Sequence, residues 1–160
     1  MLTINMISVG ALKESYHKMA CEEYKKRLAS FCKITEQTLY AEQLPQNPSE
    51  AQIAAALEAE GEAIIKALSP RAYKIAMCIE GKRFSSEALA GRFEQIEVSG
   101  LSEIDFIIGS GRGLSPSVKD SCNLILSVSD FTFSHQMMRP LLYEIIYRSI
   151  SIRHGGKYHK

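Results

Sequence analysis

One stretch decides how the chain folds: Ile104-Asp105-Phe106-Ile107-Ile108-Gly109-Ser110-Gly111-Arg112-Gly113. Its first half is almost entirely apolar, which predicts a strand buried on both faces, as in parallel sheets. Its second half holds three glycines, and glycine lets the backbone take unusual dihedral angles and approach a ligand closely. The stretch therefore predicts a buried strand that ends either in a ligand-binding loop or in a simple tight turn.

The sequence on both sides of this stretch predicts strands and helices in alternation. We expect strands over residues 2–9, 33–39, 73–79, 104–108 and 123–128, the third of them ending at Glu80-Gly81-Lys82. We expect helices over residues 12–28, 49–68, 86–98, 116–121 and 135–152. This order predicts an α/β fold with a mostly parallel sheet flanked by helices. Ligands bind beyond the carboxyl ends of such strands, so the loops after Ile79, Ile108 and Val128 should carry the chemistry.

Two of the expected helices have apolar faces. On the first helix, apolar spacing places on one face Tyr16, Met19, Ala20, Tyr24 and Leu28. On the last helix, the corresponding stripe is Met138, Leu141, Leu142, Ile145 and Ser149, with Ile146 beside it. This stripe fits either the core of one chain or an interface with a second copy. Pro140 requires either that it lies in the first turn of this helix or that the helix bends there.

The composition is that of an ordinary folded protein, with 46% hydrophobic and 23% charged residues in a chain of 160. We expect one domain over residues 1–160, ending in a short basic tail over residues 153–160. The sequence holds neither an apolar run of membrane-spanning length nor a leader pattern, so we expect a cytoplasmic protein. Its four cysteines are too scattered for a metal site and are expected to be reduced thiols, so no metal is predicted.

The end of the chain is basic. From residue 133 onward it holds five Lys or Arg residues, and Glu144 is its only acidic residue. Such a segment suits a polyanionic partner such as RNA, although an ordinary solvated tail has the same composition. The candidate RNA-binding residues are His135, Arg139, Arg153, Lys157 and Lys160.

The loop after the fifth strand is a second candidate for ligand binding. It reads Ser129-Asp130-Phe131-Thr132-Phe133-Ser134-His135, with small polar groups and two aromatic rings that could enclose an adenine. A hydrolase fits poorly, because Asp130, Ser134 and His135 are too close in sequence for a catalytic triad. A dinucleotide-binding enzyme also fits poorly, because the glycine spacing is G-x-G-x-G and the loop comes late in the chain.

Taken together, the motifs resemble one known family. They are Ile107-Ile108-Gly109-x-x-x-Gly113-Leu114-Ser115, Phe131-Thr132-Phe133-x-His135-Gln136-Met137-Met138-Arg139, Tyr147-Arg148 and Lys157-Tyr158-His159-Lys160, with Ile7-Ser8-Val9-Gly10-x-Leu12-Lys13 and Ile79-Glu80-Gly81-Lys82 in support. This series resembles the RlmH (YbeA-like) family of methyltransferases, which act on N3 of a pseudouridine in large-subunit ribosomal RNA. The resemblance covers essentially the whole chain.

The resemblance implies a SPOUT-type fold with a trefoil knot near its carboxyl terminus, a homodimer, and S-adenosyl-L-methionine as the cofactor. The residues that it implies for cofactor binding are Met77, Gly109, Ser110, Ser129, Asp130, Phe131, Thr132, Phe133 and Ser134. Those that it implies for catalysis are Arg148, Tyr158 and His159. The sequence departs from the family pattern in having Ser110 in place of a glycine, Ser134 in place of a proline, and Pro140 in place of an aliphatic residue.

The expected function is therefore methylation of a uracil-like base in ribosomal RNA, within the large subunit or the assembled ribosome. His159 and Arg148 are expected to favour loss of the N3 proton, with Tyr158 holding the base. One alternative is a non-catalytic module that binds ribosomes or RNA, since composition alone shows no catalytic signature. The other is a nucleotide- or NAD-dependent enzyme that uses the glycine loop.

Overall fold

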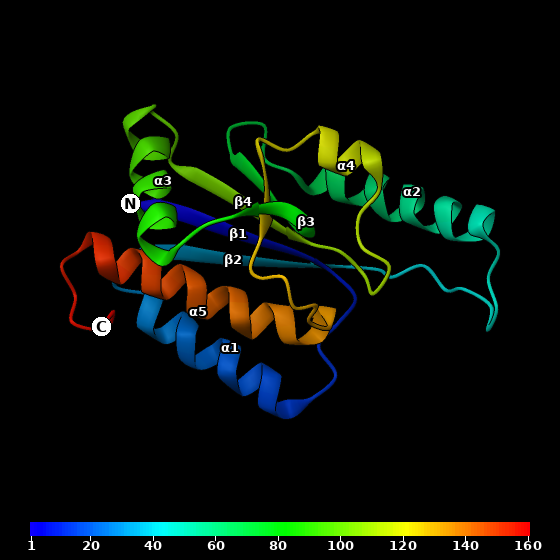
Figure 1. The fold of residues 1–160 in the computed structure, drawn as a ribbon, viewed down its shortest axis with the longest axis horizontal. Coiled ribbons are helices and arrows are strands. Elements are labelled where there is room, and N and C mark those ends of the chain that lie inside the picture. Colours follow the sequence, from blue (N-terminus) through cyan, green and yellow to red (C-terminus); the bar gives the residue numbers. More distant parts are fainter.

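The computed structural model describes residues 1–160 and contains strands and helices in alternation (Figure 1). The strands are β1 (Leu2–Val9), β2 (Cys32–Leu39), β3 (Tyr73–Arg83), β4 (Glu103–Ile108) and β5 (Leu124–Ser127). The helices are α1 (Ser15–Leu28), α2 (Glu50–Ala67), α3 (Ser86–Val98), α4 (Pro116–Asp120) and α5 (His135–Arg153). All five strands pair in parallel in one sheet of order β2-β1-β4-β3-β5, which confirms the predicted α/β class.

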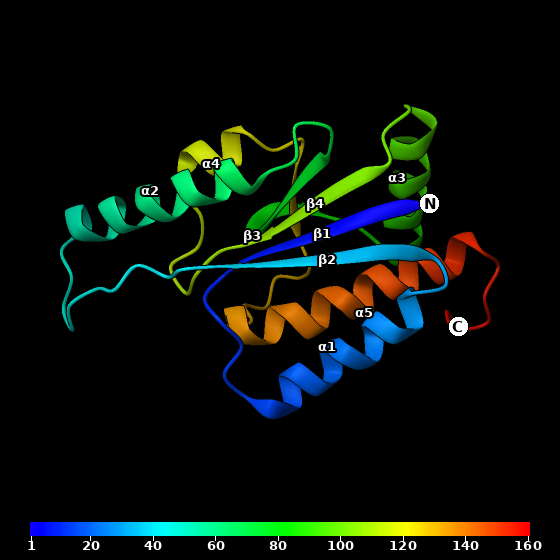
Figure 2. The ribbon, with the colours of Figure 1, turned by 180° about the vertical axis from the view of Figure 1, so that it is seen from behind.

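Helices cover both faces of this sheet. Helices α1, α3 and α5 pack together on one face, and α2 and α4 lie on the other (Figures 1 and 2). None of the helices combines the length and the apolar character needed to cross a membrane. The cysteines are free thiols, and burial raises the pKa of each to about 11.

Strand β4 separates the two parts of the core. Ile104, Phe106 and Ile108 point into the larger cluster beneath α1, α3 and α5, where Phe106 meets Phe93 of α3 edge to face at 6.2 Å. Ile107 points into the smaller cluster beneath α2 and α4. Because both faces of β4 are covered, its near-continuous apolar sequence is what a central parallel strand requires.

A chain of polar side chains crosses the centre of the sheet. Thr35 of β2 donates to Asn5 of β1, and the Asn5 amide donates to the Asp105 carboxylate of β4 at 2.6 Å. The second Asp105 oxygen accepts the backbone N–H of Ser69 at 2.8 Å. Asp105 is fully buried, and burial raises the pKa of its carboxyl group. These bonds join three strands and the end of α2 at one point.

Three sequence predictions need correction. On α1, the buried residues include His17, Cys21 and Leu28, whereas Tyr16 and Met19 are exposed. Cys21 belongs to the larger core cluster, whereas Tyr16 and Met19 face solvent. On α5, which begins at His135, Pro140 lies beyond the first turn, so the alternative that placed it in the first turn is wrong.

The third correction concerns β3, which does not end at Glu80-Gly81-Lys82 but continues to Arg83. Its pairing with β5 shifts register, so that Met77 and Lys82 both pair with Leu126. A Cβ atom on Gly81 would lie 2.7 Å from the backbone of Ile125. Glycine at position 81 therefore allows the two backbones to approach closely and does not terminate the strand.

We predict that Asp105→Ala lowers the free energy of unfolding by about 2–4 kcal/mol, because two buried donors lose their acceptor. Urea denaturation followed by circular dichroism measures the change. Glu94→Ala, at an exposed position on α3, is the control and should leave stability within about 0.5 kcal/mol of the wild type. Equal stability of all three proteins would show that the polar chain contributes nothing.

Candidate functional site

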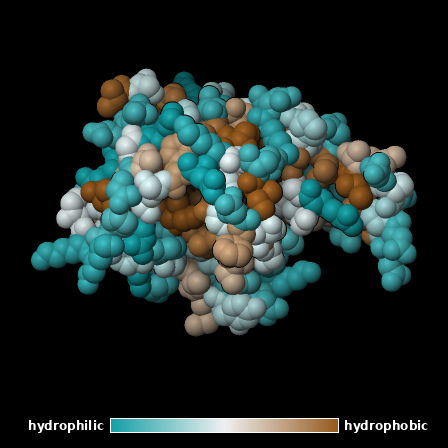
Figure 3. All heavy atoms as spheres, viewed as in Figure 1, coloured by the Kyte–Doolittle hydropathy of each residue, from teal (hydrophilic) through white to brown (hydrophobic).

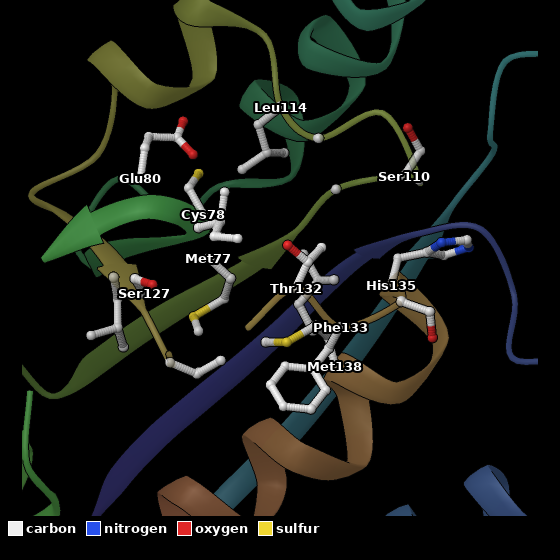
Figure 4. A pocket seen from close by; sticks show the side chains of 18 of the residues that line it. Met77, Cys78, Glu80, Ser110, Leu114, Ser127, Thr132, Phe133, His135 and Met138 are labelled. Atoms are coloured by element: carbon white, nitrogen blue, oxygen red, sulfur yellow. The ribbon is translucent and has the colours of Figure 1, made fainter. Parts of the chain in front are cut away.

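A cavity of about 610 Å³ opens at the ends of β4 and β5, beside the middle of β3, where the sequence predicts the chemistry. Its walls come from three segments that are distant in sequence, namely residues 77–80, 108–114 and 126–135 (Figure 4). Met138 of α5 and Lys119 of α4 complete the lining. Seen in space-filling form, the same side of the molecule shows apolar side chains within a largely hydrophilic surface (Figure 3).

The glycine-rich loop after β4 forms one wall, and its backbone is tightly folded. The N–H of Gly113 donates to the carbonyl of Ser110 at 2.9 Å. A Cβ atom on Gly109 would lie 2.3 Å from the Gly113 carbonyl oxygen, so no other residue fits at position 109 without moving the loop. Gly113 has a φ of +89°, which favours glycine. Of the two sequence interpretations, the loop is a tight turn and also lines a ligand-sized cavity.

The segment after β5 forms the opposite wall. Its backbone is shaped by short-range bonds, in which Ser129 Oγ accepts the N–H of Phe131 at 2.9 Å and Ser127 Oγ donates to the carbonyl of Ser129. Ser134 caps α5 by accepting the N–H of Met137 at 3.2 Å. Phe131 is 81% exposed and Phe133 41%, so a substantial aromatic surface stands at the rim of the cavity.

The cavity holds few charged groups. Lys119 pairs with Glu80 at 2.5 Å, which holds the pKa of Glu80 below its ordinary value. Burial, together with the nearby cations of Arg139 and Lys13, lowers the pKa of His135 and favours its neutral form. No group of three or more His, Cys, Asp or Glu side chains is placed to hold a metal ion. The cavity is suited to a polar heterocyclic ligand and lacks a paired nucleophile and base of its own.

Most residues predicted to bind the cofactor line this cavity. They are Met77, Gly109, Ser110, Ser129, Phe131, Thr132, Phe133 and Ser134. Asp130 does not line it, because its carboxylate is exposed and pairs with Arg83 at 2.6 Å. Sequence reasoning missed Glu80 and Lys119, whose pairing depends on the continuation of β3 beyond Ile79.

The three residues predicted to be catalytic also lie together, at the carboxyl end of α5. Glu144 joins them, accepting hydrogen bonds from Arg148 and from the Tyr158 hydroxyl, each at 2.7 Å. Burial alone would raise the pKa of Glu144, but these donors hold it below the ordinary value. His159 contacts Arg148 at 3.4 Å and Glu87 of α3 at 2.8 Å. The spacing of Glu144 and Arg148 by four residues was a signal for this pair in the sequence.

The cluster and the cavity lie at opposite ends of α5 within one chain. His135 begins the helix beside the cavity, whereas Arg148 is thirteen residues further along it. At 1.5 Å per residue this separation is about 20 Å. A single chain therefore does not bring its predicted catalytic residues to its own cavity.

The five candidate RNA-binding residues occupy different environments. His135 lines the cavity, and Lys157 and Lys160 are exposed in the tail. Arg153 pairs with Glu97 of α3. Arg139 is only 8% exposed and donates to the carbonyl of Gly10, so its guanidinium tethers the start of the β1–α1 connection and does not face solvent.

Comparison with known proteins identifies relatives that match this chain over almost its full length. The profile of a family described as "Predicted SPOUT methyltransferase" matches residues 2–159. A ribosomal RNA large subunit methyltransferase H from Streptococcus thermophilus is 45% identical over 99% of this chain and 100% of its own length. The protein of the same name from Leuconostoc mesenteroides is 44% identical over the same shares of both chains.

Two solved structures share the fold. A probable methyltransferase from Bordetella pertussis Tohama I superposes with a TM-score of 0.58 at 14% identity, covering 92% of this chain and 93% of its own. A probable methylase family protein from Haemophilus influenzae gives a TM-score of 0.53 at 17% identity, covering 99% of this chain and 70% of its own. Likeness at these identities concerns the arrangement of the elements alone.

We predict that Gly109→Ala distorts the glycine loop, because the added methyl group collides with the Gly113 carbonyl. Amide hydrogen exchange over residues 109–113 should become faster in this variant. Gly91→Ala is the matched control, since a Cβ atom there has open space within α3 and should stabilise the protein by about 0.5–1 kcal/mol. Unchanged exchange in Gly109→Ala would refute the close packing described for the loop.

Proposed function

The chain belongs to the SPOUT methyltransferases, and within them to the family of ribosomal RNA large subunit methyltransferase H, and from this premise we propose that it methylates large-subunit ribosomal RNA. We propose further that the methyl donor is S-adenosyl-L-methionine and the acceptor is N3 of a pseudouridine. The observation that carries the proposal is the cavity at the carboxyl ends of β4 and β5, beside the middle of β3, built from eight of the nine residues expected for the cofactor.

The cavity fits the proposed cofactor in size and chemistry. Its volume of about 610 Å³ lies within the range of sites that enclose small molecules. Met77, Leu114 and Leu126 supply apolar surface for a heterocyclic ring. Backbone groups of the glycine loop and of residues 127–134 would be available for hydrogen bonds to the edge of that ring and to a ribose. The bound cofactor would supply an electrophilic methyl group on a sulfonium sulfur, which the base nitrogen takes.

The catalytic work left to the protein is to activate that nitrogen. The imide N3–H of a uracil-like ring is a poor nucleophile until the proton leaves, so the site must stabilise the ring anion. We assign this role to Arg148 as the cation and to His159 as the proton acceptor. We assign the holding of the base to Tyr158. This role is supported by its ring, which lies under the Arg148 guanidinium at 4.6 Å, and by its hydroxyl, which donates to Glu144.

The 20 Å separation along α5 is the reason to propose a homodimer. In this arrangement one chain holds the cofactor, and the tail of the second chain, residues 153–160, brings the cluster around Arg148 to it. Exposed apolar groups at Tyr16, Met19 and Met137, on α1 and near the start of α5, offer surface for such an interface. The same proposal includes the trefoil knot that the family resemblance implies. It also includes a single domain over residues 1–160 and a cytoplasmic location.

A non-catalytic module that binds ribosomes remains the alternative, favoured by the exposed Lys157 and Lys160. Isothermal titration calorimetry distinguishes the two, since such a module has no need to bind S-adenosyl-L-methionine. Competition experiments test the second alternative. If the protein were an NAD-dependent enzyme, NAD would compete for the cavity and S-adenosylhomocysteine would not.

We predict that the protein transfers labelled methyl groups to ribosomes from a strain lacking this modification, and that mass mapping locates the label on a pseudouridine. His159→Ala and Arg148→Ala should each lower kcat by about 100-fold while leaving cofactor affinity nearly unchanged. Lys18→Ala, at an exposed position on α1, is the control. Wild-type rates in both variants would remove the tail cluster from the mechanism.

We predict that two inactive variants restore activity when mixed, if cavity and tail come from different chains. Gly109→Ala lacks a sound cavity and His159→Ala lacks a sound tail. Dissociation and reassociation of an equal mixture should recover about a quarter of the wild-type activity, because half the dimers then hold one intact composite site of two. A mixture with no activity, or a monomer in sedimentation at micromolar concentration, would refute the shared site.

A further inference from the structure

A second, smaller cavity lies behind the glycine loop. It measures about 160 Å³ and is lined on one side by Ser110, Gly111 and Arg112 of the loop, and on the other by α2 and the connection before it, including Leu57 and Glu60. The loop is therefore a partition, with the proposed cofactor cavity on its other side. Its position depends on what supports it from behind.

Glu60 is the one charged residue of α2 that is buried, with 5% exposure. One carboxyl oxygen accepts the backbone N–H of Glu42 at 3.2 Å. The other, Oε2, is buried and has no hydrogen-bond partner. An unpartnered oxygen in such a place is costly, and it calls for a polar group within the small cavity.

Ser110 can provide a polar group near the unpartnered oxygen of Glu60. Its side chain lies at the rim of both cavities, and its hydroxyl points away from Thr132 and Phe133 of the cofactor cavity (Figure 4). Burial raises the pKa of Glu60, and the hydrogen bond from the Glu42 amide only partly offsets that effect. The serine that replaces the usual glycine of the family thus lies next to the buried carboxyl group.

The packing around Glu60 leaves α2 little freedom to move away. Gly61, the next residue, lies against Ser115 so closely that a Cβ atom there would be 2.4 Å from the Ser115 hydroxyl. Ser115 caps α4, directly after the glycine loop. Glu60 and Gly61 thus face the two ends of the same loop, residues 110–115.

We propose that Glu60 is a positioning residue that holds the glycine loop, through Ser110, in the conformation that lines the cofactor cavity. This inference rests on the proposed function in taking the larger cavity as the cofactor site. Glu60 lines the smaller cavity and not the larger one. It acts on the affinity of the cavity by fixing the wall formed by residues 109–113.

The first test measures S-adenosylhomocysteine binding by isothermal titration calorimetry in the wild type and in Glu60→Ala, Glu60→Gln and Ser110→Ala. If Ser110 bonds to Glu60 as proposed, loss of that one hydrogen bond corresponds to about a tenfold fall in affinity, which we expect in Glu60→Ala and Ser110→Ala. Glu60→Gln keeps the shape and a polar group, so its affinity should stay within about threefold of the wild type. Glu62→Ala, exposed on the same helix, is the matched control.

The outcomes separate this inference from the proposed function. Absence of binding by the wild-type protein refutes the proposed cofactor. Normal binding by the wild type together with equal affinity in Glu60→Ala and Ser110→Ala overturns the role of Glu60 alone. Because Glu60→Ala can fail to fold, Ser110→Ala gives the independent readout, since Ser110 is only partly buried. Faster amide exchange over residues 109–113 in cofactor-free Ser110→Ala is the supporting result, and unchanged exchange is the contrary one.

The second test is the pH dependence of binding. The loop in place buries Glu60 and raises its pKa, whereas a displaced loop exposes it to water, so protonation favours the loop in place. Affinity should therefore fall as pH rises from the ordinary pKa of a glutamate to the raised one. This component of the pH dependence should be absent in Glu60→Gln, which keeps only the contribution of groups that both proteins share, such as His135 of the cofactor cavity. The other charged groups at this cavity are Glu42 and Arg112, which are unchanged in that variant. The same slope in both proteins would overturn the proposal.

Discussion

Strand β4 pairs with a parallel neighbour on each side and is covered by helices on both faces, so its backbone can be reached only where the strand ends. At that end β5 also finishes, β3 shifts its pairing register beyond Met77, and the glycine loop begins. The position of the cavity follows from this burial, because a loop leaving a fully covered strand is held firmly at its first residue. Gly109, packed against the carbonyl of Gly113, turns the chain back at once and keeps the loop compact.

Helix α5 gives the molecule two functional ends. Its first residues close the cavity, and its last turns collect Glu144, Arg148 and the folded tail. A rigid helix fixes the distance between these ends, so they cannot meet inside one chain. In the proposed homodimer, a twofold axis would bring the end of one α5 to the beginning of the other. The exposed aromatic rim around Phe131 would then lie beside the place where the two helices meet.

The sequence predicted the strands and the starts of α2, α3 and α4, because periodicity and capping are local properties. Most of the cavity residues were predicted from the family resemblance. The sequence failed where distant contacts decide. Gly81 reads as a strand breaker, yet the backbone of Ile125 makes it part of a continuing strand. Arg139 was predicted to bind RNA, but in the structure its guanidinium donates to the carbonyl of Gly10. Likewise, a glutamate in an Ala-rich helix is expected to be exposed to solvent. Only the tertiary structure shows that Glu60 lies behind the glycine loop.

The edges of the sheet affect how the protein behaves in concentrated solution. At one edge, β5 is only four residues long, which leaves little backbone for another chain to pair with. At the other edge, β2 is eight residues long and carries Lys33 and Glu36, and it also has three consecutive exposed polar positions. Charged and polar side chains on an open strand oppose the addition of a further strand. The sheet is therefore protected against growing into aggregates while the protein meets its partners through other surfaces.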